Sequence, residues 1–471
     1  MAVSTALAVG APAAGAGAAG AGVYNEAATF TGPVTTGHLI EPLSAEPSGL
    51  AAHDYVEQEF FASGTAHAFK ALSDPADGKW TITPTTSAPY TTRVIVRRPA
   101  NPARFSGTVV VEWMNVSAGE SAPDWDYFNP ALMDAGDAYI GVSAQALAVN
   151  GGAPLLGGIA GTAQGGLVQQ EPDRYGTLHH PGDQYALDMF DQIGLGVRST
   201  HSSLLGPLKP RHVVATGESQ SAFYLTTFAD ALQPRSHAFD GIFIHSRGGS
   251  GASLAGTSIA SSSGPSDLRI RTDLHEPVFM FETQTDLIQL GYAPAQQPNT
   301  SDIRTWEIAG TSHADNYLVG PAAGILGCTT PVNSGPQHVV AQAAFTSFIR
   351  WVVHGTPPPS PAPFKLQSTH PAALALDTHG NVIGGVRTPA VDVPSSTLSG
   401  APPAGASAIC SLFGSTTVFT PQTLASLYGT KAHYLKEYST DLDKAIKAGY
   451  LLPAERSSLM ALAEQVQFPA S

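Results

Sequence analysis

The sequence Gly217-Glu218-Ser219-Gln220-Ser221 holds a serine with a small residue two positions before it and another two positions after it. A serine hydroxyl is a weak nucleophile until a neighbouring base removes its proton, and the base needs an acid to orient it. Small residues at these two positions suit a serine on a sharp turn between a strand and a helix. Ser219 is therefore the candidate nucleophile for acyl transfer.

Two other segments, at 256–260 and 310–314, have the same loose pattern around Ser258 and Ser312. Only Ser219 directly follows a run of β-branched residues and precedes a segment with good helical character. This context favours Ser219, whereas an ordinary polar turn before a helix is the plain alternative.

A carboxylate that orients the base is expected in the turn after a later strand. The run PVFMF at 277–281 reads as that strand, and Asp286 follows it with room for a turn. Glu282 is the competing acid, because it is also a carboxylate and lies closer to the end of the strand. The sequence favours Asp286.

The base should come last, on a loop after the final strand. The strand TWEIA at 305–309 leads through a glycine turn to His313. Of the 16 histidines, His275 precedes the acid and His338 lies at a helix start, so both fit less well. The predicted chain order is Ser219, Asp286, His313, which is one of the known orders of such triads.

Acyl transfer also needs N–H donors that stabilise a developing oxyanion. One candidate is the backbone of Gln220, which directly follows the nucleophile at a helix N-terminus. The other should come from the loop after an early strand, and the strand at 108–113 leads to Asn115 and Val116. Gln220, with Asn115 or Val116, is the predicted oxyanion hole.

These residues must be positioned by strands and helices that alternate along the chain. We expect strands at 93–97, 108–113, 139–143, 211–216, 240–245, 277–281 and 305–309, with helices at 126–136, 183–200, 220–232 and 339–354. Alternation of this kind predicts an α/β fold, with a mostly parallel central sheet and helices on both faces. The C-terminal region predicts a helical extension at 422–428, 432–448 and 453–465.

Three regions show weaker patterns. Residues 23–92 have little periodicity, residues 150–180 read as an irregular glycine-rich loop, and residues 355–418 read as a long wrapping segment or a small appended region. Residues 1–22 form an Ala/Gly-rich leader, either a signal peptide without a basic start or a disordered segment. We expect a single domain over 23–471.

Composition and charge limit the classes of partner. Hydrophobic residues make up 43% and charged residues 13% of the chain, which is typical of a globular protein. The formal net charge of −14 argues against nucleic-acid binding. Apart from the leader at 1–22, no apolar stretch of the sequence is long enough to predict a membrane span. We expect a small-molecule ester as substrate; oligomeric state is not predicted.

The cysteines and histidines give no metal or cofactor prediction. Cys328 and Cys410 are either one disulfide or two buried thiols. The neighbouring His179 and His180 lack an obvious third ligand, so a metal site is not expected. A leader and a disulfide would fit a secreted or periplasmic location, and the alternative is the cytoplasm.

Several segments together resemble a known bacterial family, the "alpha/beta hydrolase domain" family of the α/β-hydrolase superfamily. They read VVVEWMNVSAG, HHPGDQYALDMFDQ, GESQSA, FDGIFIHSR, RTWEIAGTSHAD and CSLFGSTTVF, and the resemblance covers roughly residues 25–465. It implies the α/β-hydrolase fold, a single domain that includes the C-terminal helices, and Ser219, Asp286 and His313 as the triad. The turn before the acid departs from the family's usual pattern, because Gln284 stands where a glutamate is usual.

The leading functional hypothesis is a serine hydrolase of carboxylic esters that works through an acyl-enzyme. An acyltransferase would use the same groups with an alcohol in place of water. A binding protein without activity on the same fold is a different class, because fold alone does not fix function. An intact Ser219, Asp286 and His313 favours the enzyme.

Overall fold

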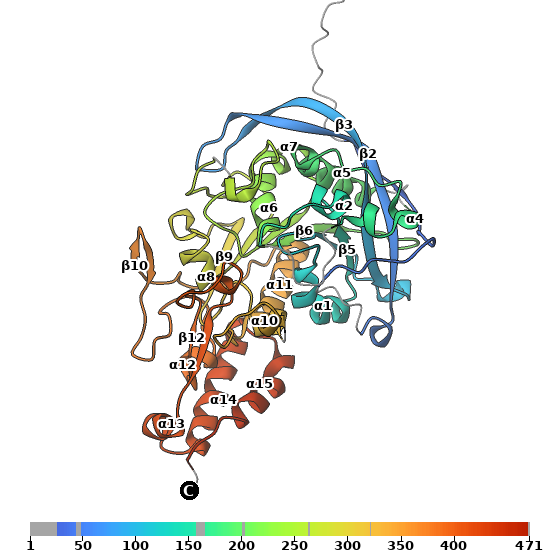
Figure 1. The fold of residues 1–471 in the computed structure, drawn as a ribbon. Coiled ribbons are helices and arrows are strands. Elements are labelled where there is room, and N and C mark those ends of the chain that lie inside the picture. The colour runs from blue at the N-terminus through green and yellow to red at the C-terminus, as the bar shows by residue number, and fades with distance from the viewer. Residues whose placement is uncertain are drawn as a thin grey trace, which may run out of the picture.

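The central element is a nine-stranded sheet with the order β1-β2-β3-β5-β4-β6-β7-β8-β9. It is described in a computed structural model that covers residues 26–43, 49–156, 165–199, 203–261, 264–320 and 322–469 (Figure 1). Neighbouring strands from β4 to β9 pair in parallel, and the pairs β1–β2, β2–β3 and β3–β5 are antiparallel. Its strands are β1 (Thr29–Thr31), β2 (Tyr55–Ser73), β3 (Thr81–Pro99), β4 (Thr108–Trp113), β5 (Ala138–Val142), β6 (His212–Glu218), β7 (Gly241–His245), β8 (Val278–Thr283) and β9 (Ile303–Ile308).

Helices cover both faces of this sheet, as the sequence predicts. Side chains of β4 alternate between two buried clusters: Val109 and Val111 pack with residues of α5 (Ala186–Arg198) and α6 (Gln220–Ala231). Val110 lies in the cluster that holds residues of α1 (Pro123–Ala135) and α11 (Gln337–His354). The strand is therefore buried on both sides, which explains its unbroken run of apolar residues.

The strand predictions hold for the parallel half of the sheet and fail in the N-terminal region. Residues 23–92, interpreted as mixed, contain β2 and most of β3, two strands of 19 residues each. This hairpin arches over the helices at the top of Figure 1. Its buried positions include small residues such as Ala62 and Ala66, and β3 contains Pro84 and Pro89. Small residues at the buried positions of β2 and prolines within β3 weaken the strand signal of these two segments.

The two segments expected to be irregular contain short elements. Residues 165–180 hold α3 (Leu167–Gln170) and α4 (Pro172–Tyr175), while 157–164 lie outside the described residues. Residues 355–418 carry two small antiparallel sheets, and so form a wrapping segment with structure of its own. The remaining elements are α2 (Ala146–Asn150), α7 (Gln233–Ser236), α8 (Gln284–Ile288), α9 (Asn316–Val319), α10 (Ala322–Ile325), α12 (Pro389–Asp392), β10 (Leu366–Thr369), β11 (Ala372–Leu374), β12 (Ser396–Ser399) and β13 (Ser415–Val418).

The C-terminal helical extension is present as predicted. It consists of α13 (Pro421–Tyr428), α14 (Lys431–Ala448) and α15 (Arg456–Glu464), and Figure 1 shows them together at the C-terminal end of the molecule. Thr420 caps α13, because its side chain accepts a hydrogen bond from the N–H of Thr423. Buried Leu442 of α14 belongs to the same apolar cluster as Val110 of the central sheet. We therefore propose that these helices and the sheet form one domain.

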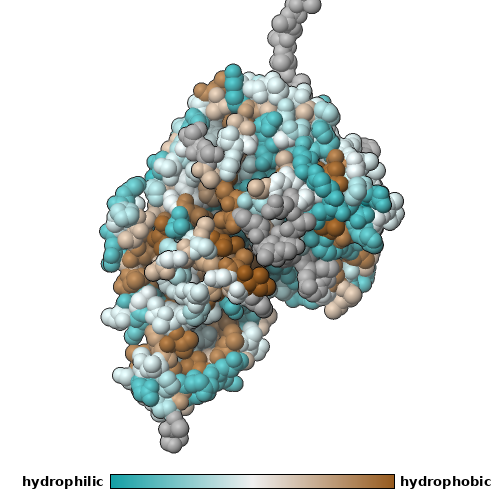
Figure 2. Space-filling model, viewed as in Figure 1, coloured by the Kyte–Doolittle hydropathy of each residue, from teal (hydrophilic) through white to brown (hydrophobic). Residues whose placement is uncertain are grey.

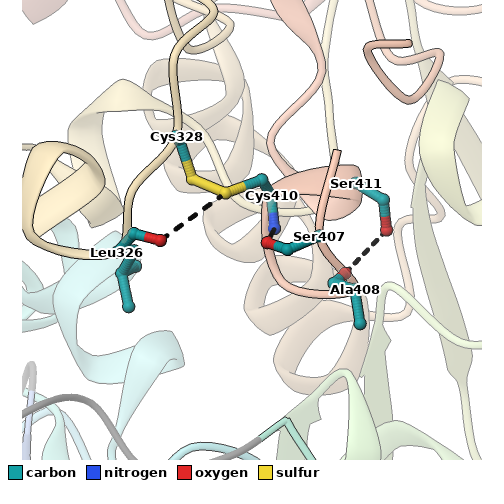
Figure 3. Close-up of a disulfide and its surroundings, with 6 residues drawn as sticks. All are labelled: Leu326, Cys328, Ser407, Ala408, Cys410 and Ser411. Carbon is teal, nitrogen blue, oxygen red and sulfur yellow. Dashed lines mark hydrogen bonds between the residues drawn. A yellow bond between two sulfur atoms is a disulfide. The ribbon is translucent and has the colours of Figure 1, made fainter. Parts of the chain in front are cut away.

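Cys328 and Cys410 form a disulfide between residues 82 positions apart (Figure 3). Of the two alternatives that the sequence left open, the structure has the disulfide and not two buried thiols. Disulfides are typical of proteins that fold in oxidising compartments. The leader at 1–22 lies outside the described residues. Within the part of the chain that is described, no helix is both long and apolar enough to cross a membrane.

Replacing Leu442 with alanine should lower the free energy of unfolding by about 2–5 kcal/mol, because it leaves a cavity in a core shared by helix and sheet. Calorimetry should show one unfolding peak, moved to lower temperature. The control is Leu462→Ala in α15, whose side chain is 56% exposed and whose effect should stay within about 0.5 kcal/mol. Two separate peaks would contradict the single domain.

Candidate active site

Ser219 lies on a tight turn at the carboxyl end of β6, directly before α6. Its backbone has φ 58° and ψ −119°, a conformation that non-glycine residues rarely adopt. The turn leaves no room at Gly217, where a Cβ atom would lie 2.9 Å from the Cβ of Ser221. The N–H of Ser219 donates to the carbonyl oxygen of His245 at 2.9 Å, which fastens the turn to the end of β7. The requirement for small neighbours is therefore steric.

The structure brings Ser219, His313 and Asp286 together, and we call these three residues the candidate triad. The Nε2 atom of His313 lies 2.7 Å from Oγ of Ser219, and its Nδ1 atom lies 2.7 Å from Oδ1 of Asp286. These side chains come from the ends of β6, β9 and β8 and meet at the carboxyl edge of the sheet. The imidazole can therefore link the hydroxyl and the carboxylate in one chain of hydrogen bonds.

The carboxylate of Asp286 is held in place by hydrogen bonds at the N-terminus of α8. Its Oδ2 atom accepts hydrogen bonds from the N–H of Thr283 at 2.6 Å and from the hydroxyl of Thr283 at 2.8 Å. This arrangement is a capping box at the first turn of α8. One carboxylate oxygen is thus fixed by Thr283, which leaves the other aimed at His313.

The alternative acid, Glu282, is not placed to orient the base. The hydrogen bonds of His313 go to Asp286 and Ser219. Glu282 is fully buried, and burial, followed by the charge of Asp286, raises the pKa of its carboxyl well above its usual range. A neutral acid would not stabilise a charged imidazole, so the geometry favours Asp286.

The predicted oxyanion donors differ in whether their N–H groups already form hydrogen bonds within the protein. The N–H of Asn115 donates to the carbonyl oxygen of Ser121 at 2.9 Å, so the prediction that this N–H serves an oxyanion is wrong. Among the described residues, the N–H groups of Gln220 and Val116 have no acceptor, and their role stays a prediction. The hydroxyl of Ser117 donates to Oε1 of Gln220 at 3.0 Å, which holds the two loops together.

Glu218 is a second carboxylate beside the base, and the sequence prediction missed it. Its Oε1 atom lies 3.4 Å from Nε2 of His313, and its Oε2 atom accepts from the side-chain amide of Asn115 at 3.2 Å. Burial raises the pKa of Glu218 to about 7, although the nearby His313 and His245 act in the opposite direction. The available signal was its position directly before the nucleophile.

The pKa of His313 is raised above its ordinary value. Burial alone would lower it, but attraction to the carboxylates of Glu218 and Asp286 and the hydrogen bond to Asp286 outweigh that effect. Two carboxylates therefore favour the protonated form of the imidazole. A histidine that acts as the base in acyl transfer must pass through this form.

A second buried Asp–His pair lies next to the candidate triad. Nδ1 of His245 is 2.7 Å from Oδ1 of Asp124, and both side chains are fully buried. Gln337 lies between the two histidines, with its amide nitrogen 3.5 Å from Nε2 of His245 and 3.5 Å from the carbonyl oxygen of His313. The hydrogen bond from the N–H of Ser219 to the carbonyl oxygen of His245 links this pair to the turn of the candidate nucleophile. Nothing in the spacing of Asp124 and His245 along the chain indicates the contact.

The other candidates from the sequence lie in different surroundings. Ser258 precedes a short 3-10 turn and does not follow a strand, and the hydroxyl of Ser312 donates to the carbonyl oxygen of Ala314. The ring of His338 stacks on Tyr317. His180 lies 3.0 Å from the carbonyl oxygen of Ala144 through its Nε2 atom. Over the described ranges, no three His, Cys, Asp or Glu side chains are grouped to hold a metal ion.

Comparison with known proteins gives one family and several distant structures. Residues 30–461 match the family model described as "Alpha/beta hydrolase domain". A fungal esterase from Rhizomucor miehei is similar at 12% identity and TM-score 0.31, over 66% of this chain and 88% of its own. A glucuronoyl esterase from Solibacter usitatus is similar at 8% identity and TM-score 0.28, over 61% and 85%. Brefeldin A esterase, a bacterial protein, is similar at 12% identity and TM-score 0.28, over 63% and 86%. No protein of curated function matches the sequence.

Glu218→Gln should move the acidic limb of the pH profile of kcat/KM to lower pH. The substitution removes a negative charge beside His313, so the pKa of the imidazole falls and the neutral base persists in more acidic solution. Initial rates on a neutral substrate between about pH 5 and pH 9 would measure the shift, with Glu171→Gln as a control at a distant carboxylate. An unchanged midpoint would contradict the assigned influence of Glu218.

Proposed function

We propose that this chain, which belongs to the alpha/beta hydrolase domain family, is a serine hydrolase that cleaves small-molecule carboxylic esters. One observation carries the proposal: the unbroken hydrogen-bond chain from Ser219 through His313 to Asp286, with 2.7 Å at each step. A hydroxyl, an imidazole and a carboxylate in this order supply a nucleophile, a base and an orienting acid. The strained turn that exposes the serine gives further support.

The reaction would begin when Oγ of Ser219 attacks the acyl carbon and Nε2 of His313 takes the hydroxyl proton. Asp286 holds the imidazole in position and stabilises its positive charge. The N–H groups of Gln220 and Val116 are our candidates for donors to the oxyanion of the tetrahedral intermediate.

The intermediate would collapse as the carbon–oxygen bond to the alcohol breaks and His313 returns the proton to the leaving oxygen. His313 then activates a water molecule, which attacks the acyl group on Ser219 and releases the carboxylic acid. The proton returns to Ser219, so the cycle consumes one ester and one water.

A fluorophosphonate probe should label the wild-type protein, and Ser219→Ala should abolish labelling, because the probe reacts with an activated serine. Hydrolysis of p-nitrophenyl acetate should fall by several orders of magnitude in the same variant. The matched control is Ser301→Ala, a change at an exposed serine. Labelling of Ser219→Ala equal to that of the wild type would refute the assigned nucleophile.

Asp286→Asn should lower kcat about 10⁴-fold, since an amide stabilises the wrong tautomer of the imidazole and no positive charge. Glu282→Gln, four residues earlier, should keep kcat within a few-fold of the wild type. Circular dichroism would establish that both variants fold. A larger loss in Glu282→Gln than in Asp286→Asn would reverse the assignment of the acid.

A further inference from the structure

We propose that the substrates are esters with an extended apolar chain, and that apolar side chains around the candidate triad bind this chain. The inference rests on the proposed function and assigns its substrate class. The residues concerned are Leu156, Leu290, Ala314, Leu318, Ile409 and Leu412, which belong to one apolar cluster. We call them the apolar collar.

The members of the apolar collar come from segments far apart in the chain that meet at one edge of the sheet. Leu156 lies in the segment after β5, Leu290 follows β8 and α8, and Ala314 and Leu318 follow β9. Ile409 and Leu412 come from the C-terminal wrapping segment. The carboxyl ends of parallel strands are where ligands bind in open α/β sheets, and Ser219 lies at the same edge.

The apolar collar is connected to the side of the site that holds the base. Ala314 directly follows His313, and its N–H donates to the carbonyl oxygen of Leu412 at 3.2 Å. Ala314 and Leu412 are both buried, with 8% and 9% of their surface exposed. The apolar wall on this side therefore begins at the residue next to the imidazole.

The apolar collar is also connected to the predicted oxyanion side. The N–H of Leu156 donates to the carbonyl oxygen of Ser117 at 2.9 Å, and the hydroxyl of Ser117 donates to Oε1 of Gln220 at 3.0 Å. Leu156 is thus two hydrogen bonds away from the residue that follows the nucleophile. The apolar collar is therefore linked to the segment that follows the base and to the segment that follows the nucleophile.

Residues that neighbour members of the same apolar cluster in the chain, Leu156 and Leu326, expose large apolar side chains to solvent. Leu155 is 42% exposed and Ile325 of α10 is 68% exposed. Figure 2 shows hydrophobic residues gathered on this face, where Figure 1 places α8 and α10. Exposed apolar surface is costly in water and marks a binding surface for apolar groups.

The disulfide joins two segments of the cluster. Figure 3 shows Cys328, two residues after Leu326, bonded to Cys410. In the sequence, Cys410 directly follows Ile409 and precedes Leu412 by two positions. The covalent link fixes the segment that carries Ile409 and Leu412 against the loop after α10. A cavity of about 270 Å³ lies beside it, and its lining is mixed: Leu326, Val332 and Phe413 are apolar, whereas Thr329, Thr330 and Ser407 are polar. An apolar wall held in this way can bind a chain without first becoming ordered.

The test is a series of p-nitrophenyl esters with acetyl, butyryl and octanoyl groups, and a second series that lengthens the alcohol instead. Each methylene transferred from water to the apolar collar should raise kcat/KM by up to about fourfold, which is about 0.8 kcal/mol. The series that shows the rise identifies whether the chain is the acyl or the alcohol part. A flat or falling kcat/KM in both series would overturn the proposal.

Leu318→Ser and Ile409→Ser should lower kcat/KM for the long ester at least tenfold and for the acetate less than threefold. The two variants lie on separate segments, so misfolding of one leaves the other as a test. Leu72→Ser, at a 65% exposed leucine of β2, is the matched control. Equal losses on short and long esters would contradict a role of these residues in binding the chain.

Labelling rates with ethyl and octyl fluorophosphonates separate the two proposals, because labelling needs no turnover. Faster labelling by the octyl probe without hydrolysis of any ester would keep the apolar collar and refute the proposed function. Hydrolysis of acetate with equal labelling by both probes would keep the function and refute the apolar collar.

Discussion

The turn at Ser219 is the constraint on which the rest of the site depends. The serine takes φ 58° between β6 and α6, a conformation that costs free energy unless the surroundings enforce it. The close contact of Gly217 with Ser221 and the hydrogen bond from Ser219 to His245 supply that enforcement. Because the sheet fixes both neighbouring strands, the hydroxyl points to the edge at which β8 and β9 deliver their own side chains.

Electrostatics then decides how the three groups behave. The imidazole of His313 lies between the carboxylates of Asp286 and Glu218, at 2.7 Å and 3.4 Å. Thr283 fixes Oδ2 of Asp286 by two hydrogen bonds. The orientation of the whole carboxylate, and so the direction of Oδ1 toward His313, is therefore set before any substrate binds. Glu218 has a pKa near 7, and its charge therefore varies with pH in the range where the histidine works. The imidazole therefore has at least one neighbouring carboxylate, that of Glu218, whose charge changes near neutral pH.

Local patterns in the sequence predicted the parallel half of the sheet and the placement of Ser219, Asp286 and His313 near one another. These predictions succeed because apolar strands and a steric requirement for small residues are short-range signals. The strand predicted at 93–97 is the end of β3, whereas β2 and residues 81–92 were missed. Small residues at the buried positions of β2 and prolines in β3 weaken the strand pattern. The position of Glu218 beside His313 and the Cys328–Cys410 bond depend on contacts between distant segments. No spacing along the chain encodes those contacts.

The C-terminal wrapping segment contributes to the candidate site together with the sheet. The hydroxyl of Thr285 donates to the carbonyl oxygen of Gly400 at 2.7 Å, and the N–H of Gly400 donates to the side chain of Gln284 at 3.2 Å. These bonds fasten the first turn of α8, which carries Asp286, to a segment more than a hundred residues later. The same segment supplies Leu412, whose carbonyl oxygen accepts from the N–H of Ala314, the residue after His313. The wrapping segment therefore holds the candidate acid, the residue after the candidate base and part of the apolar collar. Displacing this segment would disturb both the orientation of the candidate triad and the proposed binding of the ester's apolar chain.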